Sequence, residues 1–169
     1  YIDNVIVGPG MTSQGAVVGP WTPYSTILTN ITIGNGAQNF WYRRVGDSMQ
    51  LRGVITLGTT SSIGGSIIFS LPSGYTIDYN SLPANYAYIG QATGGDASPN
   101  GGWAGTVITN NGSTTQFILF GDSGKGIWNA TTPITWTTSD IINIVDVTVP
   151  ITEWAGKGIV PMLSEDNLS

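Results

Sequence analysis

Arginine is the residue type here with the clearest capacity to bind a ligand, because three of the five lysines and arginines lie close together in the sequence. They are Arg43, Arg44 and Arg52. A guanidinium group binds carboxylates and phosphates through a planar fork of N–H donors, so these residues could hold an acidic sugar or a lipopolysaccharide phosphate. The alternative is a structural role, in which they pair with Asp47, Asp146 or Glu153 within the sheet or across a subunit boundary. We expect the structural role, because a hairpin lacks the loop setting that usually shapes a ligand pocket.

Aromatic residues beside segments rich in Gly and Asn are the second group with binding potential. A flat ring stacks on the C–H face of a sugar, while neighbouring amides and carboxylates bind its hydroxyl groups. The candidates for such a site are Trp103, Trp128, Tyr86, Tyr88, Asp96 and Asn100. The alternative is packing in the core or between subunits, which accounts for most large aromatic side chains. We expect that second role for Trp21, Trp41, Trp136 and Trp154.

Catalysis and metal binding find little support. The chain has no Cys and no His, so thiolate nucleophiles and the commonest general base are excluded. A glycosidase needs two carboxylates roughly 5 to 10 Å apart, and Asp146 with Glu153 is the pair to consider, although pairing with arginine explains both. Asp96, Asn100 and Asp122 lie in Gly-rich segments and could ligate calcium, but no EF-hand spacing is present and turn capping is expected instead. We therefore expect no enzyme, no cofactor and no metal site.

The composition favours strands and restricts the partners. Only 9% of the residues are charged, and the 24 glycines and 9 prolines do not suit surface helices. So few charges mean either that Thr, Ser, Asn and Gly cover the surface or that subunits bury much of it. The net charge of −5 argues against nucleic acid as a partner. No apolar run reaches the roughly 20 residues that cross a bilayer, so we expect no membrane insertion.

The arginines belong to a hairpin that we expect between Phe40 and Leu57. Gly46 and Asp47 suit a two-residue turn whose first residue has a positive φ. Apolar and polar residues alternate after the turn, which places one face of the second strand on a core. The residues expected on the core face are Met49, Leu51, Ile55 and Leu57, and those expected outside are Gln50, Arg52 and Thr56.

Further strands and turns follow the same signals. Asn110, Asn111 and Gly112 predict a second hairpin, with strands at 103–109 and 115–120. Residues 91–102 and 121–133 are expected to be loops, and 142–149 a strand. Eight or nine short strands indicate an all-β fold, and we expect an antiparallel jelly-roll β-sandwich. The expected division is an N-terminal strand with a Gly/Pro connector from an upstream shaft at 1–20, a head domain at 21–156 and a C-terminal tail at 157–169.

A family resemblance rests on three short motifs. Residues 42–53, YRRVGDSMQLRG, are followed by the LPSG segment at 71–74 and by VPITEW at 149–154. In this order they resemble the C-terminal head domains of tailed-bacteriophage fibre and spike proteins. The resemblance covers roughly residues 21–154, and it implies a compact jelly roll of the C1q or tumour-necrosis-factor type that assembles as a trimer. No residue of a catalytic motif of that family is matched.

The resemblance implies a location on the virion and a role in host attachment. We therefore expect a homotrimeric receptor-binding knob that recognises a host-surface glycan without chemistry, joined to an upstream fibre shaft or to other virion proteins. The main alternative is a structural module for trimerisation or capsid decoration. A polysaccharide hydrolase is a lesser alternative. The arginines, Asp47 and Trp154 are expected to serve structure or assembly rather than the ligand.

Overall fold

The computed structural model describes residues 18–98, 101–121 and 126–156. These residues form one antiparallel sheet and two single-turn 3-10 helices, η1 (Tyr79–Ser81) and η2 (Thr152–Trp154). The strands are β1 (Thr22–Tyr24), β2 (Leu28–Thr32), β3 (Ala37–Val45), β4 (Ser48–Thr56), β5 (Ser62–Ser70), β6 (Tyr88–Asp96), β7 (Gly101–Thr109), β8 (Gln116–Gly121) and β9 (Ile141–Pro150). The expected all-β antiparallel class is therefore confirmed. Of the proposed divisions, 1–17 and 157–169 lie outside the described residues.

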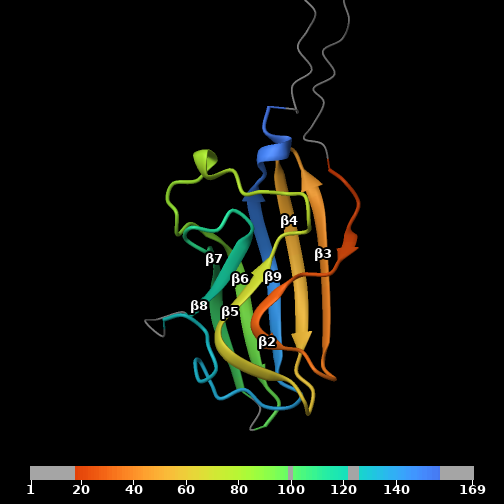
Figure 1. Ribbon diagram of the computed structural model, residues 1–169, viewed down its shortest axis with the longest axis vertical. Coiled ribbons are helices and arrows are strands. Elements are labelled where there is room, and N and C mark those ends of the chain that lie inside the picture. Colours follow the sequence, from red (N-terminus) through yellow and green to blue (C-terminus); the bar gives the residue numbers. More distant parts are fainter. Residues whose placement is uncertain (1–17, 99–100, 122–125, 157–169) are drawn as a thin grey trace, which may run out of the picture.

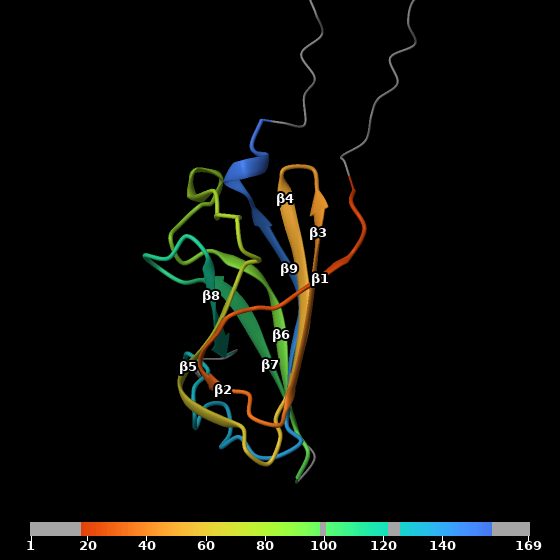
Figure 2. The ribbon, with the colours of Figure 1, turned by 45° about the vertical axis from the view of Figure 1, so that its right-hand side comes forward.

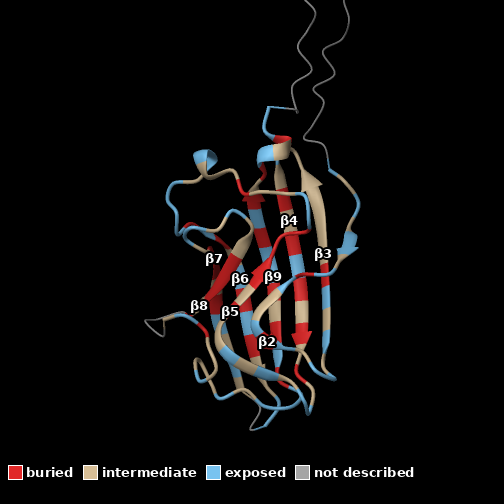
Figure 3. Cartoon of the chain, in the orientation of Figure 1, coloured by how far each residue is buried: buried red, intermediate tan, exposed pale blue. Residues whose placement is uncertain are grey.

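The sheet curls until its two ends approach each other. The strand order is β1-β3-β4-β9-β6-β7-β8-β5-β2, so β1 and β2 are the outermost strands although they follow each other in sequence. Figure 1 shows β2 and β5 in front of β4 and β9, and the turned view in Figure 2 separates the two layers. Buried residues recur along β4 and β9, as the red bands of Figure 3 show, so one face of these strands covers the core.

A buried cluster of hydrogen bonds fastens the two ends together. Thr26, in the short link between β1 and β2, donates its hydroxyl to the carbonyl of Ser70 and accepts from the amide of Ser70, both at 2.9 Å. The amide of Ile27 donates to the Ser70 hydroxyl at 2.9 Å. The Tyr24 hydroxyl adds a bond of 3.2 Å to the same carbonyl. Side chains thus join β1 to β5, where no backbone ladder is formed.

The hairpin expected from residues 40–57 is confirmed. Gly46 has a φ of 64° between β3 and β4, as its place in the turn requires. Met49, Leu51, Ile55 and Leu57 are buried, whereas Gln50, Arg52 and Thr56 are not. The second hairpin is also present, with β7 and β8 paired across a turn in which Gly112 has a φ of 82°.

A row of aromatic rings runs through the core. Successive ring centroids lie 5.0 to 5.8 Å apart along the row. Its members, in spatial order, are Trp154, Tyr75, Tyr42, Tyr24, Phe40, Phe69 and Phe117. Tilted and edge-on ring pairs of this kind contribute about 0.5 to 1.5 kcal/mol each beyond their buried area. The row therefore connects the C-terminal turn η2 with β8 through β1, β3 and β5.

The long loop expected at residues 91–102 was a wrong prediction. Residues 88–96 are β6, and β7 begins at Gly101, so strands occupy most of the described part of this segment. Asp96 and Gly101 form the last residue pair of the ladder between β6 and β7. The segment lacks a strand pattern because its inward positions are Ala92 and Gly94, which are small. The small size of Gly94 is explained by the neighbouring rings of Trp128 and Trp136, which a Cβ would meet at 3.2 and 3.0 Å.

Trp128 packs closely against two of these strand glycines, Gly94 in β6 and Gly105 in β7. Its ring is fully buried, and a Cβ on Gly94 or Gly105 would meet it at 3.2 and 2.6 Å. Its backbone joins two strands, because its amide donates to Leu119 and its carbonyl accepts from Ile67, both at 2.9 Å. Part of the segment expected to be a loop thus belongs to the core. Trp128 was expected to contact a ligand, and its burial contradicts this.

The glycine slot around Trp128 can be tested within one strand. Gly105→Ala should lower the free energy of unfolding by about 1 to 3 kcal/mol, because the new methyl group overlaps the indole. Gly102→Ala is the matched control in β7, since the nearest atom to its Cβ is the Gly94 oxygen at 3.9 Å. That control should change the free energy by less than about 0.5 kcal/mol. Urea denaturation measures the free energy of unfolding of both variants. Equal losses would show that the Trp128 ring does not restrict the residue at position 105.

Candidate functional site

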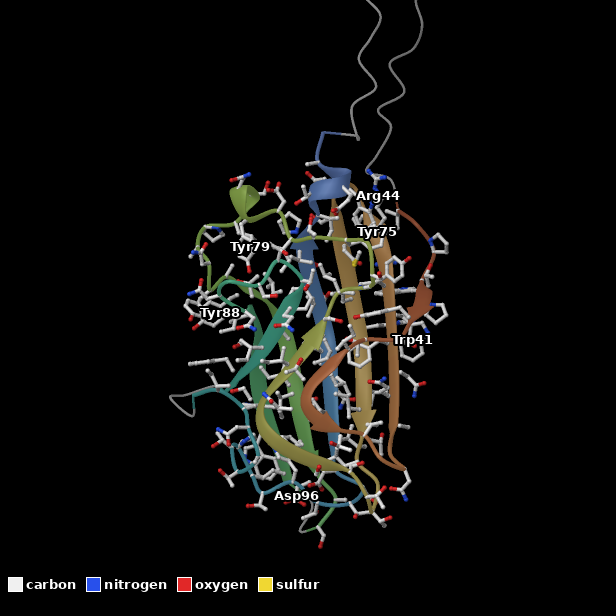
Figure 4. The ribbon with its side chains drawn as sticks, viewed as in Figure 1. Trp41, Arg44, Tyr75, Tyr79, Tyr88 and Asp96 are labelled. Atoms are coloured by element: carbon white, nitrogen blue, oxygen red, sulfur yellow. The ribbon has the colours of Figure 1, made fainter. Side chains whose placement is uncertain are left out.

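The residues expected to bind a ligand do not form one site. Asp96 lies at the lower end of the molecule in Figure 4, far from Tyr88 at its left side. The Asp96 carboxylate accepts from the amide of Ser98 at 2.8 Å, which is the turn-capping role. Trp103 is partly buried and packs against the core. Asn100 and Asp122 lie outside the described residues.

Tyr86 and Tyr88 line an apolar groove on the outer face of the sheet. The groove has a volume of about 370 Å3. Its lining residues are Tyr86, Tyr88, Ile108, Asn110, Ile118, Phe120 and Ile127. Ile108 and Ile118 are each 6% exposed but do not belong to the core cluster, because they face away from it and pair side by side in β7 and β8. Tyr86, Tyr88 and Ile127 remain 57%, 71% and 39% exposed. An exposed apolar surface of this kind commonly marks a site where another apolar surface binds.

Two of the three arginines lie on aromatic rings outside the core. The guanidinium carbons of Arg43 and Arg52 are 4.7 and 4.2 Å from the ring centroid of Trp21. Arg52 also lies 5.5 Å from the ring centroid of Trp41, its cross-strand neighbour. Arg43 Nε donates to Gln50 Oε1 at 2.7 Å. The expected pairing with Asp47 or Asp146 is therefore replaced by cation–π contacts.

Arg44 lies at the upper end of the molecule (Figure 4), where it contacts Trp154. The Arg44 guanidinium lies 5.2 Å from the Trp154 ring centroid, and its Nε donates to the carbonyl of Gly46. The carbonyl of Asp47 accepts from the amide of Ile151 at 3.0 Å. These contacts fasten the β3–β4 turn to the start of η2. The structural or assembly role expected for Arg44, Asp47 and Trp154 stays a prediction, and these contacts within the chain are compatible with it.

A polar pocket opens beside Trp41, at the edge of β3. β1 pairs with β3 only as far as Phe40, so the edge of β3 before this residue is left uncovered. The pocket has a volume of about 300 Å3, and its lining residues are Pro23, Tyr24, Ser25, Gln38, Asn39, Phe40 and Trp41. Gln38 Oε1 is buried there without a described hydrogen-bond partner. Aromatic rings thus stand beside amide and hydroxyl groups, which is the chemistry that binds a sugar.

Trp41 and Trp21 were expected to pack in the core or between subunits. Both are partly buried, but neither belongs to the core cluster or to the hydrophobic residues packed against it. No sequence signal separates Trp41 from the core residues Phe40 and Tyr42 beside it, except the alternation along a strand. That alternation places Trp41 on the outer face together with Arg43.

Asp140 was not singled out in the sequence, although it organises the lower loops. It is completely buried, and its carboxylate accepts from the amides of Ala97 and Thr137 at 2.9 and 2.6 Å. Its backbone carbonyl accepts from Leu57 at 2.9 Å. It therefore ties the β6–β7 turn to the end of β4 and to the segment before β9. A buried carboxylate with several amide donors is a structural centre.

Glu153 and Asp146, the pair considered for glycoside hydrolysis, lie outside the groove and the pocket. Both Glu153 oxygens accept from Thr76, one from its amide and one from its hydroxyl. Asp146 is exposed on β9, and neither acid lines the groove or the pocket. Among residues 18–98, 101–121 and 126–156, no group of three or more Asp, Glu, His or Cys residues is placed to hold a metal ion. The same residues include no helix with the length and apolarity needed to span a membrane.

Burial raises the pKa of Tyr24, which adjoins the pocket, and also raises the pKa values of Tyr75 and Tyr79. A raised pKa in the folded state means that the unfolded chain loses its phenolic protons first. Stability should therefore be full below about pH 10 and fall as the pH rises above it. For Tyr24 the slope approaches about 1.4 kcal/mol per pH unit.

Urea denaturation of the protein and of Tyr24→Phe, from pH 8 to pH 11, checks this expectation. The variant should be slightly less stable at pH 8, because it lacks the bond to Ser70, but its loss above about pH 10 should be shallower. Parallel pH profiles would show that Tyr24 does not contribute.

Comparison with known proteins gives no relative. No family model matches the chain, and neither a curated protein nor a solved structure is significantly similar to it.

Proposed function

We propose that the chain is a non-catalytic attachment head of a phage tail fibre or a related virion appendage, and that it binds a host-surface glycan in the pocket beside Trp41. The observation that carries the proposal is the composition of this pocket. An indole ring adjoins Gln38, Asn39 and Ser25, which can donate to and accept from sugar hydroxyl groups. The family resemblance of the sequence supports the same role.

In this proposal the head is a jelly-roll knob that assembles as a homotrimer through the apolar groove. The groove leaves two tyrosines and an isoleucine exposed, and a chain with only 9% charged residues has little charge with which to solvate such a surface. A second copy of the chain is the occupant that fits. Tyr88 and Trp41 lie on opposite sides in Figure 4, so assembly through the groove leaves the pocket open. Several pockets in one particle would also raise the avidity for a repetitive glycan.

Trp41→Leu tests the pocket, because it keeps an apolar side chain but removes the flat ring. Its affinity for a monovalent oligosaccharide, chosen from an array of bacterial surface glycans, should fall about tenfold in calorimetry. Tyr86→Leu makes the same exchange in the groove and should leave the affinity per site unchanged. The proposal fails if no glycan binds saturably. It also fails if Trp41→Leu binds normally, and loss of binding in Tyr86→Leu alone would assign the sugar to the groove.

Ile127→Asp tests the assembly, since a carboxylate in the groove would be buried without a partner. Light scattering should report a trimer for the protein and a monomer for this variant. Ile27→Asp is the control, because Ile27 is 70% exposed but lies outside the groove. A monomeric protein, or an Ile127→Asp variant that stays trimeric, would contradict the proposed interface.

A structural module that binds other virion proteins is the second candidate, and the apolar groove is the observation that favours it. A stable trimer that binds no glycan on the array would support this alternative. Release of new reducing ends from a bacterial polysaccharide would instead support a hydrolase.

A further inference from the structure

The outer face of β3 and β4 brings two positive charges onto one ring. Arg43 and Arg52 come from neighbouring strands, and both guanidinium groups lie within 5 Å of the Trp21 ring centroid. A guanidinium group that stacks on a ring keeps its N–H donors in its own plane, pointing away from the ring system. A cation–π contact holds a guanidinium group near a ring without using its N–H donors.

Most of those donors have no partner in the described part of the chain. Nε of Arg43 is engaged by Gln50, and no other hydrogen bond or ion pair between described residues involves Arg43 or Arg52. Arg52 is also exposed. Charge-assisted hydrogen bonds to an oxyanion are among the strongest that an arginine makes, so this pair is prepared for an anionic ligand.

One carboxylate belongs to the part of β9 that lies opposite Arg52 in the sheet. β9 has a bulge opposite Arg52, where the register shifts between Leu51 and Gly53, and this bulge includes Asp146. Asp146 is exposed and forms no described ion pair with Arg52. Its charge should repel an incoming anion, so its removal should have the opposite effect to removal of an arginine.

The pair adjoins the pocket proposed for the sugar. Trp41 lines that pocket and also carries the guanidinium of Arg52. One molecule can thus place a sugar ring in the pocket and an oxyanion at Arg52. We propose that the glycan is acidic and that Arg52, with Arg43, binds its carboxylate or phosphate group. This inference rests on the proposed glycan-binding function and names the chemical class of its ligand.

Three probes separate the sources of the charge: glucuronic acid, its neutral methyl ester and inorganic phosphate. Titrations are followed by NMR through the indole N–H signals. Glucuronic acid should bind at least about fivefold more tightly than the ester and should shift the Trp21 and Trp41 signals. Its binding should weaken as the ionic strength rises from about 0.05 to about 0.5 M. Phosphate binding at the same signals, without glucuronate binding, would assign the site to a phosphorylated glycan.

Variants of Arg52 and of Asp146 should change the affinity for the anionic probe in opposite directions. Arg52→Gln should remove most of the preference for the charged probe, whereas Arg52→Lys should retain part of it, because it keeps the charge but not the fork. Asp146→Asn should strengthen binding of the anion about twofold to threefold and leave the ester unaffected. If Arg52→Gln does not fold, the sign of the Asp146→Asn effect decides the inference.

The two proposals fail in different ways. Equal binding of glucuronic acid and its ester, unchanged in the Arg52 and Asp146 variants, overturns the acidic class and leaves the glycan-binding function standing. Binding of phosphate at Arg52, with no sugar of any charge bound on the array, overturns the glycan-binding function and retains the oxyanion site. Absence of binding by all three probes to the folded protein overturns the inference.

Discussion

The closure of the curled sheet depends on the buried hydrogen bonds between Thr26 and Ser70. Thr26 lies between β1 and β2, which are the two ends of the sheet order. Since β5 is the neighbour of β2, the link between β1 and β2 has to bring β1 close to β5. The Thr26 hydroxyl donates to the carbonyl of Ser70 and accepts from its amide, and both residues are buried. Buried polar groups stabilise a fold only when they are paired, and here the pairing also fixes the position of Tyr24. Tyr24 then continues the aromatic row, and the place where β1 leaves β3 becomes the pocket.

Turn chemistry and strand alternation were enough to predict both hairpins and the buried face of β4. Gly46 and Gly112 occupy backbone conformations that few other residues adopt, so the signal in the sequence is local and strong. The part of β6 from residue 91 on was missed, because its inward residue Gly94 is small for a reason that lies elsewhere in the chain. Gly94 and Gly105 leave space for Trp128, and a glycine that serves a distant ring has the same local appearance as a glycine in a loop.

The candidate site was less accessible to prediction than the fold, because it depends on contacts between segments far apart in sequence. That Tyr86 and Tyr88 are exposed agrees with their expected availability, but the Ile108 and Ile118 floor beside them becomes visible only when β7 and β8 are paired. Arg43 and Arg52 were expected to meet carboxylates. They lie instead on Trp21 and Trp41, and Trp21 lies well before the hairpin in the chain. No periodicity within the hairpin indicates that contact.

The ends of the sheet have a further consequence for solubility. An uncovered strand edge offers a row of backbone donors and acceptors on which other chains can polymerise, and charged side chains commonly prevent this. This chain has few charges, yet its outermost strands are poor templates. β1 has only three residues and contains Pro23, which has no backbone N–H. β2 is interrupted at Asn30, where φ is 64° and the register shifts. Short and irregular edges therefore protect the protein from aggregation where charge does not.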